Sequence, residues 1–571
     1  TFNGSGAQTV TTGGTGTGND FNNVTITNTA ASPGTDYVQT SGAIKVDGTL
    51  DVTDGQFIPA ANSDFVNVTL SSSNGKLKPA GLGIITVSGT WNNSGGSAAS
   101  FEGNFGTVAF DAGGAQSLTS GGISFYNLST STSSTVVTIQ DALIVSNNLT
   151  IAASTTLDAG SNQAISVGRI WDNGNGGTFT SASGTVTFNG SLNQTITTGG
   201  VGSGNDFYNL TIANTGSPAD PLDVETSGAI KVTGTLDVTD GQFMPATSSE
   251  FLDVTVSASG GILKPASSSS ITVSGNWSDA SGTFIPNSGT VTMDGTSKTI
   301  ATGASNEFNN LTISGSVTTS TANDVEVEGT LTVSGSLTVS PGDELTLEDA
   351  TVSGTLTVDA DGSNNAKLDF SEADNPVFGI TGTLRLDGED ASNRAIVTSD
   401  NDSRIDFDIT GSGFLNADYF TFQYPNTDGL NITGSGTQVL SYGAFDYPAN
   451  SGTLLNISAA TDLPDEITGF SFGNTGSASS PKNVTADVTT DLVTFTSYSG
   501  ALASDASTAE TNETDANNKV YWFDNVWYSS GDQTPTDNTK WWSTNGGQGL
   551  NPTDFTTSSH KFIVQSGNTY T

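Results

Sequence analysis

The chain has 571 residues, enough for several globular domains or one long repetitive domain, and only 34% of them are hydrophobic. It has no cysteine, which excludes disulfides and thiolate metal sites. Its formal net charge of −42 disfavours binding to nucleic acid or anionic membranes, because both need Lys or Arg to replace their counterions.

The same composition favours some partners and forms of the protein over others. A strongly acidic surface attracts cations, so calcium is the cofactor we expect if there is one. No run of about 18 apolar residues is present, so we expect no direct membrane insertion. No signal peptide is visible and residue 1 is Thr, so we expect a processed product or a segment of a longer protein.

A duplication organises the first half of the sequence. Residues 1–91 align with residues 187–277 without a gap, and SGAIKVDGTLDVTDGQF (41–57) returns as SGAIKVTGTLDVTDGQF (227–243). A shorter phrase, GTVxF, recurs at 106–110 and 184–188. Proteins built as stacks of similar coils lengthen by copying blocks, so the repeat predicts a repetitive architecture.

Within each block the pattern predicts short strands separated by glycine turns. In residues 325–362 apolar side chains alternate with Thr, Ser and Glu, which is the period of a strand with one buried face. The alternating apolar residues are Val325, Val327, Leu331, Val333, Leu337, Val339, Leu345 and Leu347, and the predicted turns fall at Gly329, Gly335, Gly342 and Gly354. No apolar stripe at helical spacing is visible, so we expect no helix.

These strands favour an all-β fold, a right-handed parallel β-helix (β-solenoid), over an array of β-sandwiches. Single glycines or Ser-Gly pairs separate the strands, and Asn and Thr recur at equivalent places, as stacked coils require. We expect repeat blocks at 1–186 and 187–320 and a regular solenoid at 321–445. A less regular β-rich continuation at 446–519 and a Trp-rich capping or docking module at 520–571 should follow.

The phrases TVTFNGSLNQTIT, DFYNLTI and GTLDVTDGQF resemble the giant secreted or surface-exposed β-helix repeat proteins of bacteria. The resemblance covers roughly residues 1–360 and continues more weakly beyond them. The Trp-rich segment 520–571 is similar to modules that open new solenoid sections in such proteins. The resemblance implies an extracellular structural, adhesive or matrix role, and it carries over no catalytic residue.

One loop is a candidate calcium site. DADGSNNAKLD (359–369) places four oxygen-bearing side chains in a glycine-containing stretch, with Glu372 and Asp374 close behind. Calcium binds such hard oxygen ligands on flexible loops, although Asp-rich turns are also common without metal. The predicted ligands are Asp359, Asp361, Asn364 and Asp369.

An enzyme is the weakest alternative. Parallel β-helices include polysaccharide lyases, and Arg394 and Arg404 lie among aspartates in GEDASNRAIVTSDNDSRIDFD (388–408). Surface ion pairs and turn aspartates explain the same cluster. The only histidine, His560, stands in a strand-like segment, and we interpret it as structural.

Two further patterns each have a structural and a functional interpretation. The sequons at Asn209 and Asn310 recur inside a strand phrase, which favours stacked structural asparagines over glycosylation. The aromatic residues of the last fifty positions form either a subunit-docking or glycan-binding surface or a small core that caps the solenoid. Those residues are Trp522, Trp527, Trp541 and Trp542.

The sequence as a whole predicts a non-catalytic, extracellular or cell-surface structural protein. Its subunits are expected to assemble head to tail into a homopolymeric fibre, filament or surface layer. The alternative is an adhesin that binds glycans or other cell-surface components through its Trp-rich end.

Overall fold

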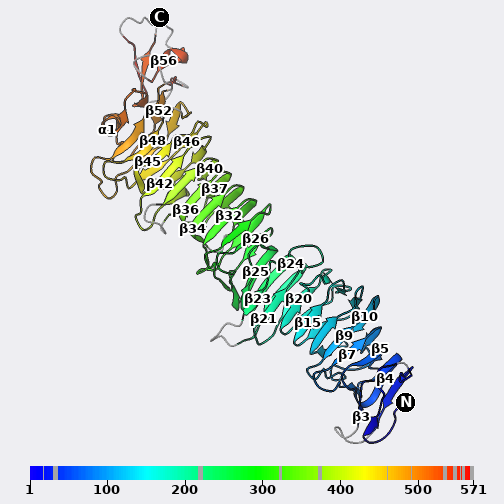
Figure 1. Cartoon of the computed structure of the whole chain (residues 1–571). Helices are drawn as coiled ribbons and strands as arrows, with labels where there is room; N and C mark the ends of the chain where they lie inside the picture. Colours follow the sequence, from blue (N-terminus) through cyan, green and yellow to red (C-terminus); the bar gives the residue numbers. More distant parts are fainter. Residues whose placement is uncertain are drawn as a thin grey trace. The chain divides into compact units, whose positions relative to one another are not determined.

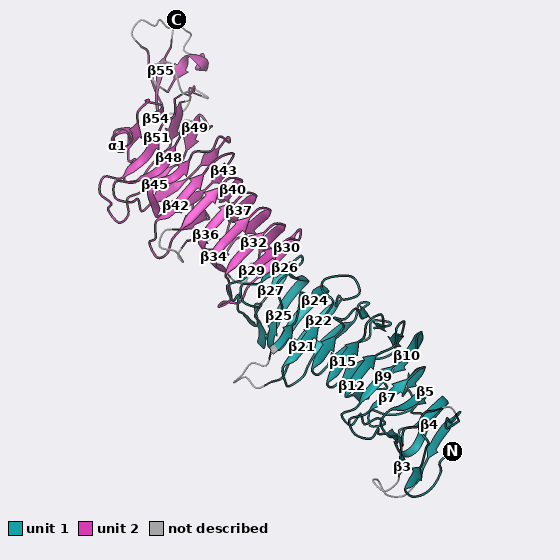
Figure 2. Ribbon diagram, in the orientation of Figure 1, with its two compact units in different colours: residues 1–289 teal, residues 290–571 magenta. Residues whose placement is uncertain are grey.

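The computed structural model describes residues 1–571 except 17, 30–36, 217–222, 321–323, 371–375, 459–460, 490–491, 531–535, 544–549, 553–554, 556–559 and 566–571. These residues form two compact units, Thr1–Gly289 and Thr290–Thr571 (Figure 2). The predicted boundary between the sequence blocks, at 186/187, falls inside unit 1 and within strand β20 (Thr185–Phe188). The copied block is therefore a unit of sequence and not a compact unit of structure.

In unit 1 the strand pairings run in three parallel series, and the chain passes through the three resulting sheets in turn. Figure 1 shows the strands of successive coils stacked side by side. Successive strands belong to different sheets, and each strand pairs in parallel with the strand one coil later. Leu128, for example, lies opposite Leu149, and Leu149 lies opposite Trp171. In the middle of the unit the first sheet contains β9 (Thr107–Phe110), β12 (Asn127–Thr130), β15 (Asn148–Ile151) and β18 (Ile170–Asp172). The second contains β10 (Ala115–Thr119), β13 (Val136–Ile139), β16 (Thr156–Asp158) and β19 (Thr178–Thr180), and the third contains β11 (Ser124–Phe125), β14 (Leu143–Val145), β17 (Ile165–Val167) and β20.

Unit 2 has the same construction. Its first sheet includes β32 (Asn310–Ile313), β34 (Val325–Val333), β36 (Glu344–Val352), β39 (Val377–Ile380) and β42 (Ile405–Ile409). The second includes β35 (Ser336–Val339), β37 (Thr355–Asp359) and β40 (Thr383–Asp387). The third includes β38 (Ala366–Asp369), β41 (Ala395–Thr398), β44 (Phe420–Gln423) and β47 (Ala444–Asp446). The predicted all-β parallel solenoid is confirmed.

The predicted strand period is confirmed in residues 325–362. All eight alternating apolar side chains, from Val325 to Leu347, are at most 1% exposed. Gly342 occupies a turn with φ of 87°. Gly329, in contrast, lies inside β34, which continues around a corner where its register against β36 shifts. A corner in this fold does not always interrupt the strand.

Copies of one phrase lie on different faces of the solenoid. GTVAF ends with β9, in the first sheet of unit 1, whereas GTVTF ends with β20, in the third. The two occurrences of the phrase are therefore not separated by a whole number of coils. The interior accepts this offset because all three faces present the same alternating apolar side chains.

A line of glycines lets neighbouring coils of unit 2 approach closely. The members share a small polar residue on each side, and a Cβ on any of them would lie 2.0–2.2 Å from the carbonyl oxygen of the glycine one coil earlier. They are Gly315, Gly335, Gly354 and Gly382. The sequence repeats glycine at these positions because no side chain fits between the backbones.

The C-terminal part of unit 2 contains a small separate sheet and one helix. Strand β55 (Val526–Ser529) pairs antiparallel with β56 (Trp541–Trp542) and parallel with β57 (Lys561–Ile563). The expectation of no helix is wrong at α1 (Ala506–Asn512), where the Asp505 carboxylate caps the N-terminus by accepting from Thr508 N at 2.8 Å. Seven residues are too few for a helical stripe to show in the sequence. Among the described residues, no helix has the length and hydrophobicity needed to cross a membrane.

Candidate functional site

The four predicted calcium ligands do not form one group. Asp359 ends β37, and the next two ligands lie in the turn that follows, where the Asp361 carboxylate accepts hydrogen bonds from the backbone N–H groups of Ser363 and Asn364 at 2.9 and 3.0 Å. The Asp361 carboxylate therefore shapes its own turn. Asp369 belongs to a different cluster, and Glu372 and Asp374 lie outside the described residues. Calcium binding at this loop stays a prediction.

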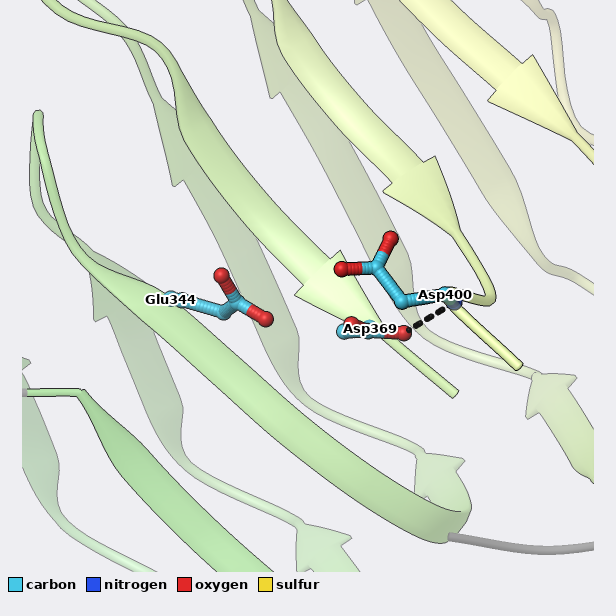
Figure 3. A group of neighbouring side chains, drawn as sticks. All are labelled: Glu344, Asp369 and Asp400. Atoms are coloured by element: carbon cyan, nitrogen blue, oxygen red, sulfur yellow. Dashed lines mark hydrogen bonds between the residues drawn. The ribbon is translucent and has the colours of Figure 1, made fainter. Parts of the chain in front are cut away.

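The Asp369 cluster gathers three carboxylates from three consecutive coils. Oxygen atoms of Glu344, Asp369 and Asp400 lie within 4.8 Å of one another, and Asp369 also accepts from Asp400 N at 3.0 Å (Figure 3). Glu344 begins β36, Asp369 ends β38, and Asp400 follows β41. These acids lie more than twenty residues apart in the sequence, and the stacking of coils brings them together.

A lysine ammonium supplies the positive charge in this cluster. Lys367 Nζ lies 3.0 Å from Glu344, 2.9 Å from Asp369 and 2.7 Å from Asp400. Burial opposes the charged form of Lys367, but the hydrogen bonds to the three carboxylates outweigh it and raise the pKa. Burial also raises the pKa of Glu344, which Lys367 partly offsets. The cluster is thus an internal ion-pair network that ties three coils together.

Arg394 and Arg404, the residues of the lyase alternative, lie at different corners of the solenoid and bind the backbone. Arg394 precedes β41, and its Nη1 donates to the carbonyls of Phe420 and Tyr442 at 2.8 and 2.7 Å. Arg404 precedes β42, and its Nη1 donates to the carbonyls of Tyr447 and Pro425. Both guanidinium groups thus hydrogen-bond the coil that carries them to later coils.

Each arginine donates to the carbonyl of one member of a stacked pair of tyrosines that the sequence analysis missed. Tyr419 and Tyr442 stack with ring centroids 4.4 Å apart and planes 3° apart. Tyr424 and Tyr447 stack at 4.3 Å and 16°, and the Arg404 guanidinium lies 5.8 Å from the Tyr424 ring centroid. The signal is present in the sequence as QYPN (423–426) and DYPAN (446–450), whose Tyr-Pro pairs fall one coil apart.

A hollow of about 330 Å³ lies beside the second tyrosine pair. Its lining combines aromatic, charged and amide side chains with a glycine corner: Asp402, Arg404, Tyr424, Tyr447, Asn450 and Gly476 are among its residues. Burial and a hydrogen bond with Asp402 raise the pKa of Tyr424. This is the most varied polar and aromatic surface among the candidate sites.

Three of the four predicted docking tryptophans are buried. Trp522, 1% exposed, ends the aromatic core of the solenoid and stacks on Phe495 at 4.6 Å. Trp527 and Trp541, 3% and 4% exposed, form the core of the small C-terminal sheet with Phe523. Trp542 is partly buried. The first three of these tryptophan rings therefore belong to a core and are not exposed on the surface. His560 packs edge-on against Trp527, at 5.4 Å.

The sequon asparagines use their side-chain oxygens to join coils. The Oδ1 of Asn209 accepts from Thr235 N at 2.9 Å, and that of Asn310 accepts from Thr330 N at 3.1 Å. A Cβ on Gly234 would lie 2.5 Å from the Asn209 oxygen, which explains the Gly-Thr pair one coil later. The structural interpretation of these asparagines matches the geometry. Glycosylation stays untested.

Comparison of the chain with known protein families, with curated proteins and with solved structures finds no match. The class of the protein therefore follows from its own geometry, which is that of a parallel β-solenoid.

Proposed function

We propose that the protein is a non-catalytic structural component outside the cell, which assembles head to tail into a fibre, filament or surface layer. The resemblance of its repeats to giant secreted and surface-exposed bacterial β-helix proteins supports the location. The many groups committed to joining coils support a mechanical role, since ion pairs, arginines and asparagines are all used between neighbouring coils.

One observation carries the assembly proposal: the two copies of the block differ in how their first apolar residues are covered. In the second copy these residues are buried under β17, β18 and β19, whereas their counterparts in the first copy are partly exposed. The buried set is Phe188, Ile196 and Phe207, and the partly exposed set is Phe2, Val10 and Phe21. A further coil therefore fits the partly exposed surface. That coil comes either from the same polypeptide or from a second subunit, and the assembly proposal takes it from a second subunit.

Edge strands supply the backbone groups for such a contact. Among the described residues β1 (Gln8–Val10) pairs only with β3 (Tyr37–Thr40), and β57 pairs only with β55. Ile563 of β57 is 45% exposed. A strand added at an edge gains main-chain hydrogen bonds, and a contact between two different surfaces extends without closing.

Charge opposes the approach of two subunits with a formal net charge of −42 each. Salt screens this repulsion, and divalent cations lower it further by binding at acidic surfaces. Calcium accordingly enters the proposal as a cation that promotes assembly.

Sedimentation velocity over a range of protein concentrations tests the proposal. The unsubstituted chain should form concentration-dependent multimers, and Val10→Asp should sediment as single chains because it places a charge in the contact. Leu82→Asp is the control, since Leu82 is 81% exposed on a lateral loop and should leave assembly unchanged. Single chains at every concentration, or multimers that survive Val10→Asp, would refute head-to-tail assembly through this surface.

A further inference from the structure

The hollow beside Tyr424 and Tyr447 has a volume and a lining that suit a ligand site. Its volume of about 330 Å³ is at the small end of the range for ligand pockets, about 300–1,000 Å³, and suits a ligand of monosaccharide size. Gly476 leaves one position beside the Tyr447 ring without a side chain, because a Cβ there would lie 3.9 Å from Cδ1. An aromatic ring thus borders open space.

The backbone of both tyrosines is unusual for their size. Tyr424 and Tyr447 have φ of 56° and 54°, in the left-handed region that bulky residues rarely adopt. At most other such positions of this chain the residue is Gly, Ser or Asn. Tyr419 and Tyr442 share this conformation, with φ of 42° and 49°, so the open space beside Tyr447 and not the backbone distinguishes the hollow.

The polar groups around the rings define the ligand's chemistry. Asp402 offers a carboxylate acceptor. Asn450 offers its amide N–H groups as donors, since its side-chain oxygen already accepts from Ser479. The Arg404 guanidinium is already bonded to two carbonyls and lies near the face of Tyr424, so it is not a free anion receptor. The formal net charge of −42 repels polyanions.

We infer that this hollow binds a neutral carbohydrate. The C–H face of a pyranose ring packs against the Tyr447 ring, and its hydroxyl groups donate to Asp402 and accept from the Asn450 amide. Aromatic surfaces with a few placed polar groups bind such amphipathic ligands. The site is independent of subunit assembly and lies away from the Trp-rich end.

The other tyrosine pair provides an internal control. Tyr442 also has a left-handed backbone, with φ of 49°, and stacks on Tyr419. A Cβ on Gly469 would lie only 2.4 Å from its Cδ1, so the backbone of the next coil closes against this ring. Neither Tyr419 nor Tyr442 lines the hollow.

The test is isothermal titration calorimetry of the full chain carrying Val10→Asp, so that assembly does not affect the result. The probes are cellohexaose, xylohexaose, mannohexaose and chitohexaose, with oligogalacturonate as the acidic comparison. Tyr447→Asn removes the ring and keeps a residue that tolerates a left-handed backbone, and Tyr442→Asn is the matched control. Hydrogen exchange of both variants checks that the coils stay folded.

At least one neutral oligosaccharide should bind at one site per chain. Tyr447→Asn should weaken that binding at least tenfold, and Tyr442→Asn should change it less than twofold. The inference is wrong if none of the four neutral probes binds at millimolar concentration, if oligogalacturonate binds more tightly than all of them, or if the two variants lose affinity equally. If Tyr447→Asn unfolds its coil, Asp402→Ala is the second variant and should cause the same loss.

Discussion

Replacing Gly335 by alanine should destabilise the solenoid at a corner where neighbouring backbones lie close together. The Cβ would lie 2.0 Å from the Gly315 carbonyl oxygen and 2.5 Å from that of Ser314. Both atoms are backbone, so they cannot move aside as a flexible side chain would. The same place holds inter-coil hydrogen bonds, from Gly335 N to Ile313 O at 2.9 Å and from Ser336 N to Gly315 O at 2.8 Å.

The magnitude follows from these two effects. Overpacking of an interior costs about 1–3 kcal/mol, and a weakened backbone hydrogen bond adds about 1 kcal/mol. We therefore expect a local loss of about 2–4 kcal/mol in unfolding free energy. Solenoids do not unfold in one global step, so the loss should be confined to the coils around the substitution.

Hydrogen exchange followed by mass spectrometry measures this local stability. Peptides from residues 310–360 should exchange about 30- to 1,000-fold faster, since about 1.4 kcal/mol corresponds to tenfold. Gly379→Ala is the control, because Gly379 lies within β39 and its Cβ would meet nothing within 4 Å. That change should be neutral or stabilising by about 0.4–1 kcal/mol. Equal effects of the two substitutions, or no effect of Gly335→Ala, would refute the reasoning.

Substitutions at three further positions test other contacts by the same exchange measurement. Asn209→Ala should cost about 1–3 kcal/mol because it leaves Thr235 N without its acceptor, whereas Asn209→Asp keeps an acceptor and should cost less; equal costs would contradict this. Burial raises the pKa of Glu513 to about 7 from its ordinary 4.5, so the folded state should lose stability as pH rises from 4.5 to about 7. Glu513→Gln should reduce that loss while keeping the acceptor for Trp522 Nε1, and an unchanged pH profile would count against it. Lys367→Met should cost about 2 kcal/mol in the coils that carry Glu344, Asp369 and Asp400, and added calcium should restore the stability of those coils only in that variant; calcium protection of those same coils in the unsubstituted protein would argue against the ammonium as the cluster's cation.

The sequence predicts the fold through features that are local. A strand with one buried face shows its period over a few residues, as in 325–339, and a glycine that admits no side chain recurs in consecutive coils of unit 2. The order of strands around a solenoid then needs no long-range information, since each coil lies on the one before it. The unpredicted helix α1 is short and held by one cap, so it leaves no periodic signal.

The candidate sites depend on which coils lie side by side, and the sequence shows this poorly. Coil length varies, so Glu344, Asp369 and Asp400 are unequally spaced in the sequence although they lie together in the structure. The sequence analysis grouped Asp369 with the ligands of the 359–364 turn, whereas the structure places it with Glu344 and Asp400. The tryptophans of 520–571 show the same limit, because an aromatic cluster reads alike whether its rings form a core or a surface. Burial decided between the two for Trp527 and Trp541.

Electron microscopy of the purified protein tests the central claim, head-to-tail assembly of a structural solenoid, most directly. Negatively stained samples should show filaments in calcium, shorter or fewer filaments after chelation, and none for Val10→Asp. Dispersed single chains of the unsubstituted protein in both conditions would contradict it.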